Sequence, residues 1–300
     1  MNINNGEILS LVSIPDFNLN SRKLISDNDY INRATKGVYE LGSVFKSFTI
    51  AAGLNYGLIS PEYMFENIER KMKCGERVIS EYDENLPEDL SVEDILVYSS
   101  NIGSVKIGQL VGQEKLKNFL KQIGVLSQLN FDIEEIGKPL PFTWRDCKLK
   151  TVSYGHGITT TPIQLAKGYA ILANGGYEIR PTLIKKDTYK SKKKRILKKN
   201  VSSQINNIFR KVVTHGTASL SDVEGYEVGG KTGTAQIVEN GVYTNKKINT
   251  FASVFPSSDP KYVLVILLED TKLSKDYVYK YRNKPGSFKG TPFNTAGWTS

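Results

Sequence analysis

Three β-type runs near the end of the chain constrain the fold more than any other feature of the sequence. They cover residues 227–238, 250–255 and 262–269. Short turns separate them, one at Asn240-Gly241 and one around Asp259-Pro260, and such residues favour a tight reversal of the backbone. Sequential strands joined by short turns usually pair with one another. We therefore predict an antiparallel meander of three strands.

The region before these strands carries mainly helical patterns. Apolar residues recur at helical spacing after Ser43, with Gly57 as a stop, and Thr161-Pro162 combines a hydroxyl N-cap with proline at the first helical position. Further helices are predicted over residues 91–98, 104–112, 114–123 and 202–214. An Asn5-Gly6 turn followed by apolar residues over 8–14 predicts a lone N-terminal strand. The expected fold class is α+β, an antiparallel sheet flanked by helices, with a helix-rich insertion over roughly 50–175.

The net charge of +9 belongs to one segment. Between Lys185 and Lys199 there are nine Lys or Arg residues against one Asp, so the rest of the chain is nearly neutral. A single lysine run such as 192–195 is typical of a solvated loop, and we predict no nucleic-acid partner. No apolar run approaches the roughly 18 to 20 residues that span a bilayer. Cys74 and Cys147, with only two histidines, cannot build the usual zinc cluster, and the sequence does not show whether they pair.

The first candidate for chemistry is Ser43-Val44-Phe45-Lys46. The two polar side chains stand one turn apart at the start of a buried helix, so they share a face. A serine hydroxyl needs a base to become a nucleophile, and a lysine among apolar groups can have a pKa low enough to serve. Taken alone, such a spacing also arises by chance in a chain rich in serine and lysine.

Two further motifs follow along the chain. Ser99-Ser100-Asn101 places a hydroxyl and an amide two residues apart, although, taken alone, this motif is better explained as a polar turn that caps the next helix. Lys231, Thr232, Gly233 and Thr234 lie within the first β-type run, where a glycine permits close approach of a ligand to the backbone or marks a bulge. In this order, the three motifs form a set close to that of penicillin-binding proteins and serine β-lactamases.

The resemblance extends over nearly the whole chain. The sequence resembles the transpeptidase domain of class B penicillin-binding proteins, and within that class the division-specific septal branch. The matching segments are 32–35, 39–43, 99–103, 161–166, 173–176, 216–218 and 229–235, with 11–18 and 295–298 closest to the septal branch. The resemblance implies the penicillin-binding protein and serine β-lactamase fold.

The resemblance also implies roles for the first two motifs. Ser43 is expected to attack the penultimate D-Ala carbonyl of a peptidoglycan stem peptide, with Lys46 as its general base. Ser99 is expected to pass a proton to the leaving D-Ala amine. Asn101 is expected to hold the substrate amide and to help position Lys46.

The third motif is expected to bind substrate. The strand carrying Lys231, Thr232, Gly233 and Thr234 would take the stem peptide by strand addition, with the amine and the two hydroxyls facing its terminal carboxylate. The backbone N–H groups of Ser43 and Thr234 would form the oxyanion hole. An amine of a second stem peptide would then resolve the acyl-enzyme into a cross-link. No metal or organic cofactor is implied.

The same resemblance suggests a cellular setting. Peptidoglycan stem peptides and β-lactams are the expected ligands, membrane-bound division proteins are the expected partners, and the periplasmic face of the inner membrane is the expected location. Residues 1–300 are expected to be one transpeptidase domain truncated at both ends, because the family carries a membrane anchor before this region and a helix after it.

Three alternatives stay open at this stage. A serine β-lactamase shares the fold and similar motifs, but the context of Glu134 and Glu135 differs from that of the usual deacylating glutamate. A non-catalytic module is a second alternative. The intact Ser43, Lys46 and Lys231 argue against a silent scaffold, whereas only the closer match to the septal branch argues against a penicillin-sensing domain that is acylated once. An elongation-specific relative is a third. His156 and His215 invite a Ser-His assignment, but with a lysine base available we interpret both as structural.

Overall fold

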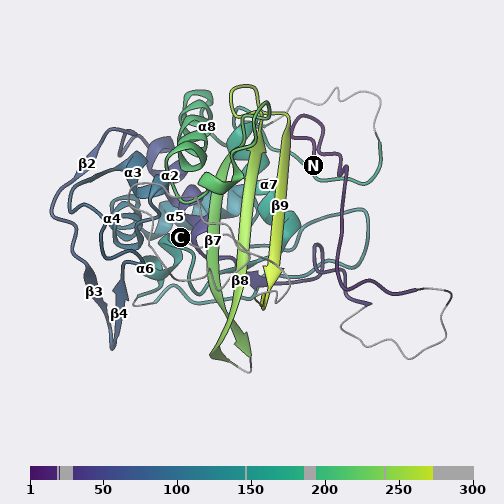
Figure 1. Cartoon of the computed structure of the whole chain (residues 1–300), viewed down its shortest axis with the longest axis horizontal. Helices are drawn as coiled ribbons and strands as arrows, with labels where there is room; N and C mark the ends of the chain where they lie inside the picture. The colour runs from purple at the N-terminus through teal and green to yellow at the C-terminus, as the bar shows by residue number, and fades with distance from the viewer. Residues whose placement is uncertain (19, 21–29, 146, 186–193, 240, 273–300) are drawn as a thin grey trace.

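A three-stranded antiparallel sheet forms the centre of the molecule (Figure 1). The computed structural model describes residues 1–18, 20, 30–145, 147–185, 194–239 and 241–272. The strands are β7 (Gly229–Glu239), β8 (Val242–Phe255) and β9 (Tyr262–Glu269), paired in the order β7-β8-β9. The predicted meander is confirmed, and the mixed helices and antiparallel sheet confirm the α+β class.

Two helices pack against the sheet. They are α7 (Pro162–Ala173) and α8 (Lys199–Thr214); α8 contacts β7, and α7 contacts β8 and β9. At the start of α7, Thr161 accepts a hydrogen bond from the backbone N–H of Gln164, and the Gln164 side chain accepts one from the Thr161 N–H. This capping box and the proline at the first turn fix where the helix begins.

The remaining helices form a lobe beside the sheet, with the β3–β4 hairpin at its outer edge (Figure 1). Each of the predicted helices is present, although α4 begins at Asn101 and α8 at Lys199, each three residues before its expected start. The Ser91 side chain and Asp94 form a second capping box at the start of α3. The elements of the lobe are η1 (Gly42–Phe45), α2 (Lys46–Asn55), α3 (Val92–Val97), α4 (Asn101–Val111), α5 (Gln113–Ile123) and α6 (Lys148–Ser153). The short η2 (Ser219–Ser221) packs instead against α8.

Three small antiparallel pairs complete the described structure, and sequence patterns predicted none of them. Two of the pairs have strands of only two residues, which is too short for an alternation of apolar and polar residues to be detected. A disulfide bond joins Cys74, at the end of β3, to Cys147 just before α6, which settles the pairing that the sequence left open. The pairs are β1 (Tyr39–Glu40) with β6 (Thr159–Thr160), β2 (Met64–Phe65) with β5 (Leu90–Ser91), and β3 (Lys71–Cys74) with β4 (Arg77–Ser80).

The predicted strand over residues 8–14 is wrong. The turn before it is present, because Gly6 has φ +84° and its N–H donates to the Asn2 carbonyl. After a single bridge from Glu7 to Thr182, however, the chain makes no ladder, and Val12 and Ile14 stay exposed. Apolar alternation forms a strand only where a neighbouring strand accepts its hydrogen bonds, and residues 1–3 instead pair with the start of β9.

An aromatic cluster lies beneath η1 and α2. The Phe48 ring packs edge to face against both Phe45 and Tyr169, and Tyr169 stacks on Phe209 at 5.2 Å between ring centroids. The Tyr169 hydroxyl donates to the Val44 carbonyl and exchanges a hydrogen bond with the Ser47 hydroxyl. The cluster thereby joins η1, α2, α7 and α8 in one core, which fixes the segment that carries Ser43.

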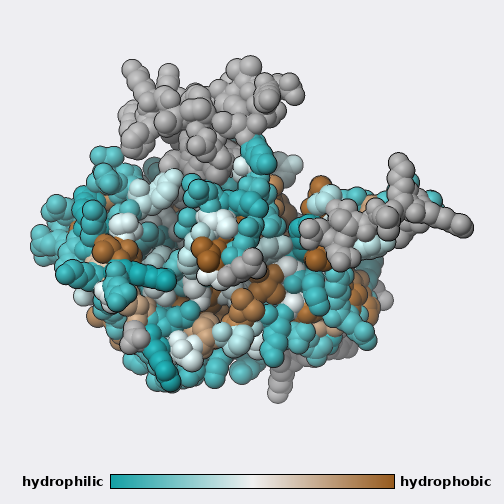
Figure 2. All heavy atoms as spheres, turned by 90° about the horizontal axis from the view of Figure 1, so that it is seen from below, coloured by the Kyte–Doolittle hydropathy of each residue, from teal (hydrophilic) through white to brown (hydrophobic). Residues whose placement is uncertain are grey.

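The surface is mostly hydrophilic on the face shown in Figure 2, with apolar side chains in separate patches. Among the described residues, no helix is both long and apolar enough to cross a membrane. Most of the predicted lysine-rich loop, and the segment at 295–298 that carries part of the resemblance, lie outside the described residues.

Candidate active site

Ser43 lies at the junction of η1 and the sheet. Gly42 precedes it with φ +63°, and a Cβ at Gly42 would overlap the Thr234 carbonyl oxygen of β7. Glycine adopts this backbone conformation and this close approach without a steric penalty. Ser43 is half-buried, while Val44 and Phe45 beside it are fully buried. The turn therefore holds Ser43 close to β7 and anchors it in the core.

Lys46 opens α2, one turn after Ser43, and its side chain is completely buried. The Lys46 Nζ donates to the Ser99 hydroxyl at 3.0 Å and also to the Ser99 carbonyl. Burial lowers the pKa of Lys46 to about 7, against an opposing effect of the Glu81 carboxylate. A buried ammonium loses hydration that its neighbours replace only in part, so the amine is neutral in a large fraction of molecules near neutral pH.

Ser99 and Asn101 lie at the turn that leads into α4. Ser99 has φ +65°, which is uncommon for a residue with a side chain. The buried Glu81 carboxylate holds this turn, because it accepts hydrogen bonds from the Ser100 hydroxyl at 2.5 Å and from the backbone N–H groups of Asn101 and Ile102 at 2.6 and 3.0 Å. A carboxylate at a helix N-terminus satisfies the free N–H groups and interacts favourably with the helix dipole.

The strand β7 approaches Ser43 through Gly233. A Cβ at Gly233 would overlap the Leu41 carbonyl oxygen and would come within 3.2 Å of the Val44 nitrogen. The absence of a side chain thus lets η1 pack directly on the backbone of β7. This contact explains a glycine in a strand interior, where its flexibility is otherwise unfavourable.

Lys231 and the two threonines of β7 add polar groups to the same region. Lys231 is fully buried, its Nζ donates to the Thr232 carbonyl at 3.1 Å, and burial together with nearby Lys46 lowers its pKa. The Thr232 hydroxyl lies 2.9 Å from the Thr217 hydroxyl, and the Thr234 hydroxyl donates to Asn249 on β8 at 3.3 Å. Two buried amines and several hydroxyls therefore line one region with little compensating negative charge.

The structure brings most of the predicted residues together in this region. Lys46 contacts Ser99 directly, and Gly42 and Gly233 bring the Ser43 turn against β7. The Asn101 Nδ2 donates to the Ser80 carbonyl at 2.9 Å, and the roles expected for Asn101 toward Lys46 and the substrate stay predictions.

Sequence reasoning missed Glu81 and gave Thr217 no role. Glu81 lies next to β4, in a segment that has neither a motif nor an apolar alternation to mark a buried carboxylate. Thr217 belongs to a segment that matched by resemblance, but no pattern connected it with Thr232. Within the described part of the chain, no three His, Cys, Asp or Glu side chains gather in a way that would hold a metal ion.

Comparisons with known proteins point to one family. The family described as penicillin binding protein transpeptidase domain matches residues 1–286. The probable peptidoglycan D,D-transpeptidase FtsI of Caulobacter vibrioides is 31% identical over 312 residues, which cover 100% of this chain and 50% of the relative. Stage V sporulation protein D of Bacillus subtilis is 30% identical and is matched over 45% of its length by 91% of this chain. The chain thus spans about half the length of these curated relatives.

Solved structures share the fold. The transpeptidase domain of penicillin-binding protein 3 from Burkholderia pseudomallei superposes with a TM-score of 0.79 at 25% identity, over 90% of this chain and 78% of that one. Penicillin-binding protein 3 of Mycobacterium tuberculosis, solved with aztreonam, superposes with a TM-score of 0.73 over 80% of this chain and 58% of that one. At 24% identity, the second likeness concerns the fold.

Proposed function

The chain belongs to the penicillin-binding protein transpeptidase domain family, and on this premise we propose that it is a peptidoglycan D,D-transpeptidase that cross-links stem peptides through an acyl-enzyme on Ser43. The observation that carries the proposal is the buried Lys46 amine. Lys46 lies one helical turn after Ser43, its Nζ donates to the Ser99 hydroxyl, and β7 packs against the segment that carries Ser43. Acyl transfer needs this set: a serine, an amine that is neutral near pH 7 and a second hydroxyl.

Acylation begins at Ser43. Lys46 takes the Ser43 proton as the Oγ attacks the penultimate D-Ala carbonyl, and the backbone N–H groups of Ser43 and Thr234 stabilise the oxyanion. As the peptide bond to the terminal D-Ala breaks, the proton passes from Lys46 through the Ser99 hydroxyl to the leaving amine. The hydrogen bond between Lys46 Nζ and Ser99 Oγ supports this relay.

The substrate terminus lies along β7. Lys231 and the hydroxyls of Thr232 and Thr234 face the terminal carboxylate, whose negative charge compensates buried amines that otherwise resist protonation. The peptide backbone adds to β7 by strand pairing, and Gly233 keeps η1, and with it Ser43, packed directly on this strand. With its Nδ2 bonded to Ser80, Asn101 receives the substrate amide at Oδ1.

The second half of the reaction forms the cross-link. An amine of another stem peptide attacks the ester carbonyl, Lys46 accepts its proton through Ser99, and the Ser43 oxygen leaves with a proton. By similarity to relatives named FtsI, we place this reaction in septal wall synthesis, with membrane-bound division proteins as partners, on the periplasmic face of the inner membrane. β-Lactams acylate the same serine.

A peptide assay tests the proposal. The chain is incubated with a stem peptide ending in D-Ala-D-Ala and an amine acceptor, and mass spectrometry follows the released D-Ala and the joined product. We expect both with the wild type and neither with Ser43→Ala or with a peptide ending in L-Ala. Release of D-Ala with water as the only acceptor, together with rapid turnover of penicillin, would favour the hydrolase alternative and contradict the transpeptidase.

A further inference from the structure

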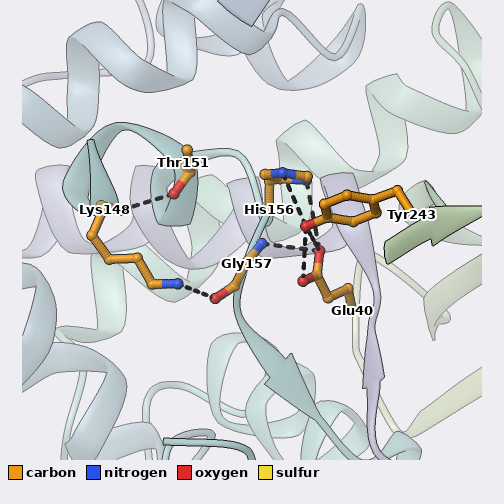
Figure 3. A network of polar contacts seen from close by, with 6 residues as sticks. All are labelled: Glu40, Lys148, Thr151, His156, Gly157 and Tyr243. Carbon is orange, nitrogen blue, oxygen red and sulfur yellow. Dashed lines mark hydrogen bonds and ion pairs between the residues drawn. The ribbon is translucent and has the colours of Figure 1, made fainter. Parts of the chain in front are cut away.

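A polar cluster that none of the three motifs contains lies directly before the Ser43 turn (Figure 3). Glu40, three residues before Ser43, accepts hydrogen bonds from the Gly157 N–H at 3.0 Å and from the Tyr243 hydroxyl at 3.2 Å. The His156 Nε2 lies 3.1 Å from the same Tyr243 hydroxyl, and its Nδ1 lies 3.6 Å from the Glu40 carboxylate. The cluster therefore ties together β1, the loop before β6 and the start of β8.

The rings of the cluster are held in place by stacking. His156 lies between Tyr154 and Tyr243, with centroids 6.0 and 5.0 Å away. Burial and the Glu40 carboxylate raise the pKa of Tyr243, so the phenol keeps the proton that it donates. Burial lowers the pKa of His156 against the opposing effect of Glu40, and the charges of Lys148 and Arg77 lower it further. Lys148 is held through its bond to the Gly157 carbonyl at 2.5 Å.

The loop that carries His156 also touches the Ser43 turn directly. A Cβ at Gly155 would overlap the Gly42 carbonyl oxygen and would come within 3.0 Å of the Phe45 Cβ. Gly42 in turn abuts Thr234 of β7. A shift of this loop thus moves the Ser43 turn relative to β7, and these two segments supply the N–H groups of the proposed oxyanion hole.

We propose that Glu40, His156 and Tyr243 act together as positioning residues that clamp the Ser43 turn against β7 and thereby set the rate of acylation. The clamp rests on the proposed function, because it acts through the nucleophile and touches no reacting atom. Small displacements of reacting groups are costly, since a shift of about 1 Å can slow a reaction by about 100-fold.

Acylation kinetics test the clamp. A fluorescent penicillin at several concentrations separates its dissociation constant K from the acylation rate constant k2, for the wild type, Glu40→Gln, Tyr243→Phe and the double variant. Glu239→Gln is the matched control, because its exposed carboxylate pairs with Lys246 on the same hairpin as Tyr243. We expect k2 to fall about tenfold in Glu40→Gln and about threefold in Tyr243→Phe, with K unchanged and the control equal to the wild type.

The double variant distinguishes a shared clamp from separate structural effects. Because both single changes break the same contact, the double variant should be no more than about twofold slower than Glu40→Gln. Three results would overturn the clamp: a fall of k2 in the double variant equal to the product of the two single falls, a change confined to K, or a wild-type k2 in Glu40→Gln.

Hydrogen exchange separates this inference from the proposed function. Amide exchange over residues 39–46 needs no substrate, and we expect it to be faster in Glu40→Gln than in the wild type and in Glu239→Gln. Equal exchange would overturn the clamp. A wild type that penicillin does not acylate would overturn the proposed function, and the exchange result would still decide whether the clamp exists.

Discussion

The proposed chemistry depends on two buried amines, those of Lys46 and Lys231, that have few negative charges near them. Lys46 and Lys231 are both completely buried, and burial together with the charge of nearby Lys46 lowers the pKa of Lys231. Glu81 is the carboxylate that raises the pKa of Lys46, and burial outweighs it. At the scale of the residue, desolvation therefore produces a base near neutral pH without a histidine.

The pH dependence of acylation follows from Lys46. Since its pKa is lowered to about 7, the amine is mostly protonated below that pH and mostly neutral above it. The penicillin acylation rate should therefore rise with pH through about 7 and level off above it. Lys46→Arg should lose about 100-fold or more at every pH, because a guanidinium stays protonated. A wild-type rate that is constant between pH 5.5 and 8.5 would contradict the base role of Lys46.

Removal of the Glu81 charge should affect both catalysis and stability. In Glu81→Gln the carboxylate no longer raises the pKa of Lys46, so the midpoint of the acylation profile should move to lower pH. The bonds to Asn101 and Ile102 lose their charge, which should cost about 1.5 to 3 kcal/mol in urea unfolding. Asp83→Asn, which changes a partly exposed carboxylate two residues away, is the control. An unchanged midpoint in Glu81→Gln would show that this charge does not reach Lys46.

The sequence predicted the motif residues of the site better than the residues that support them. Ser43, Lys46 and Lys231 belong to short motifs whose order along the chain is informative. Glu81 and the Glu40 cluster act through long-range contacts between short segments, and no local spacing reveals such contacts. From the sequence we interpret His156 as structural. In the structure its ring contacts Glu40 and Tyr243, which no local pattern predicts.

At the scale of elements, local signals decided which predictions succeeded. The helices that begin with capping boxes at Ser91 and Thr161 appear where expected, because a capping box depends on residues only three positions apart in the sequence. The pairing of β1 with β6 joins segments more than a hundred residues apart through two residues each, so it escapes any periodicity. The strand predicted over 8–14 is wrong for a related reason: a local pattern of apolar residues does not show whether a partner strand lies alongside.

Glycine contacts between elements should be sensitive to a single methyl group. Gly155 and Gly225 both have positive φ, but only a Cβ at Gly155 meets neighbouring atoms, namely the Gly42 carbonyl oxygen. Gly225→Ala should cost about 1 kcal/mol from backbone strain alone. Gly155→Ala should cost more in urea unfolding and should also slow acylation, because the Ser43 turn must move. Equal stabilities of the two variants, both with the wild-type acylation rate, would contradict this packing.

At the scale of the whole molecule, the disulfide joins two segments of the helical lobe. Cys74 and Cys147 are 73 residues apart in sequence, and the bond ties the β3–β4 hairpin, which leads to Glu81, to the segment before α6. Cross-links over long loops restrict the unfolded chain, typically by about 2 to 4 kcal/mol. Cys74→Ser with Cys147→Ser should lower the urea midpoint, and a reductant should lower the wild-type midpoint to match. An unchanged midpoint, with both thiols shown to be free, would contradict this contribution.

The molecule as a whole places the proposed active residues at the boundary between the helical lobe and the sheet. Ser43, Lys46 and Ser99 come from the lobe, whereas Lys231 and Thr234 come from β7. The central claim is that this boundary makes Ser43 a nucleophile. The most direct test is the intact mass of the chain after incubation with a penicillin, for the wild type, Ser43→Ala and the exposed-site control Ser60→Ala. We predict one adduct, stable for hours, on the wild type and on Ser60→Ala and none on Ser43→Ala; an adduct that persists in folded Ser43→Ala, or no adduct on folded wild type, would contradict the account.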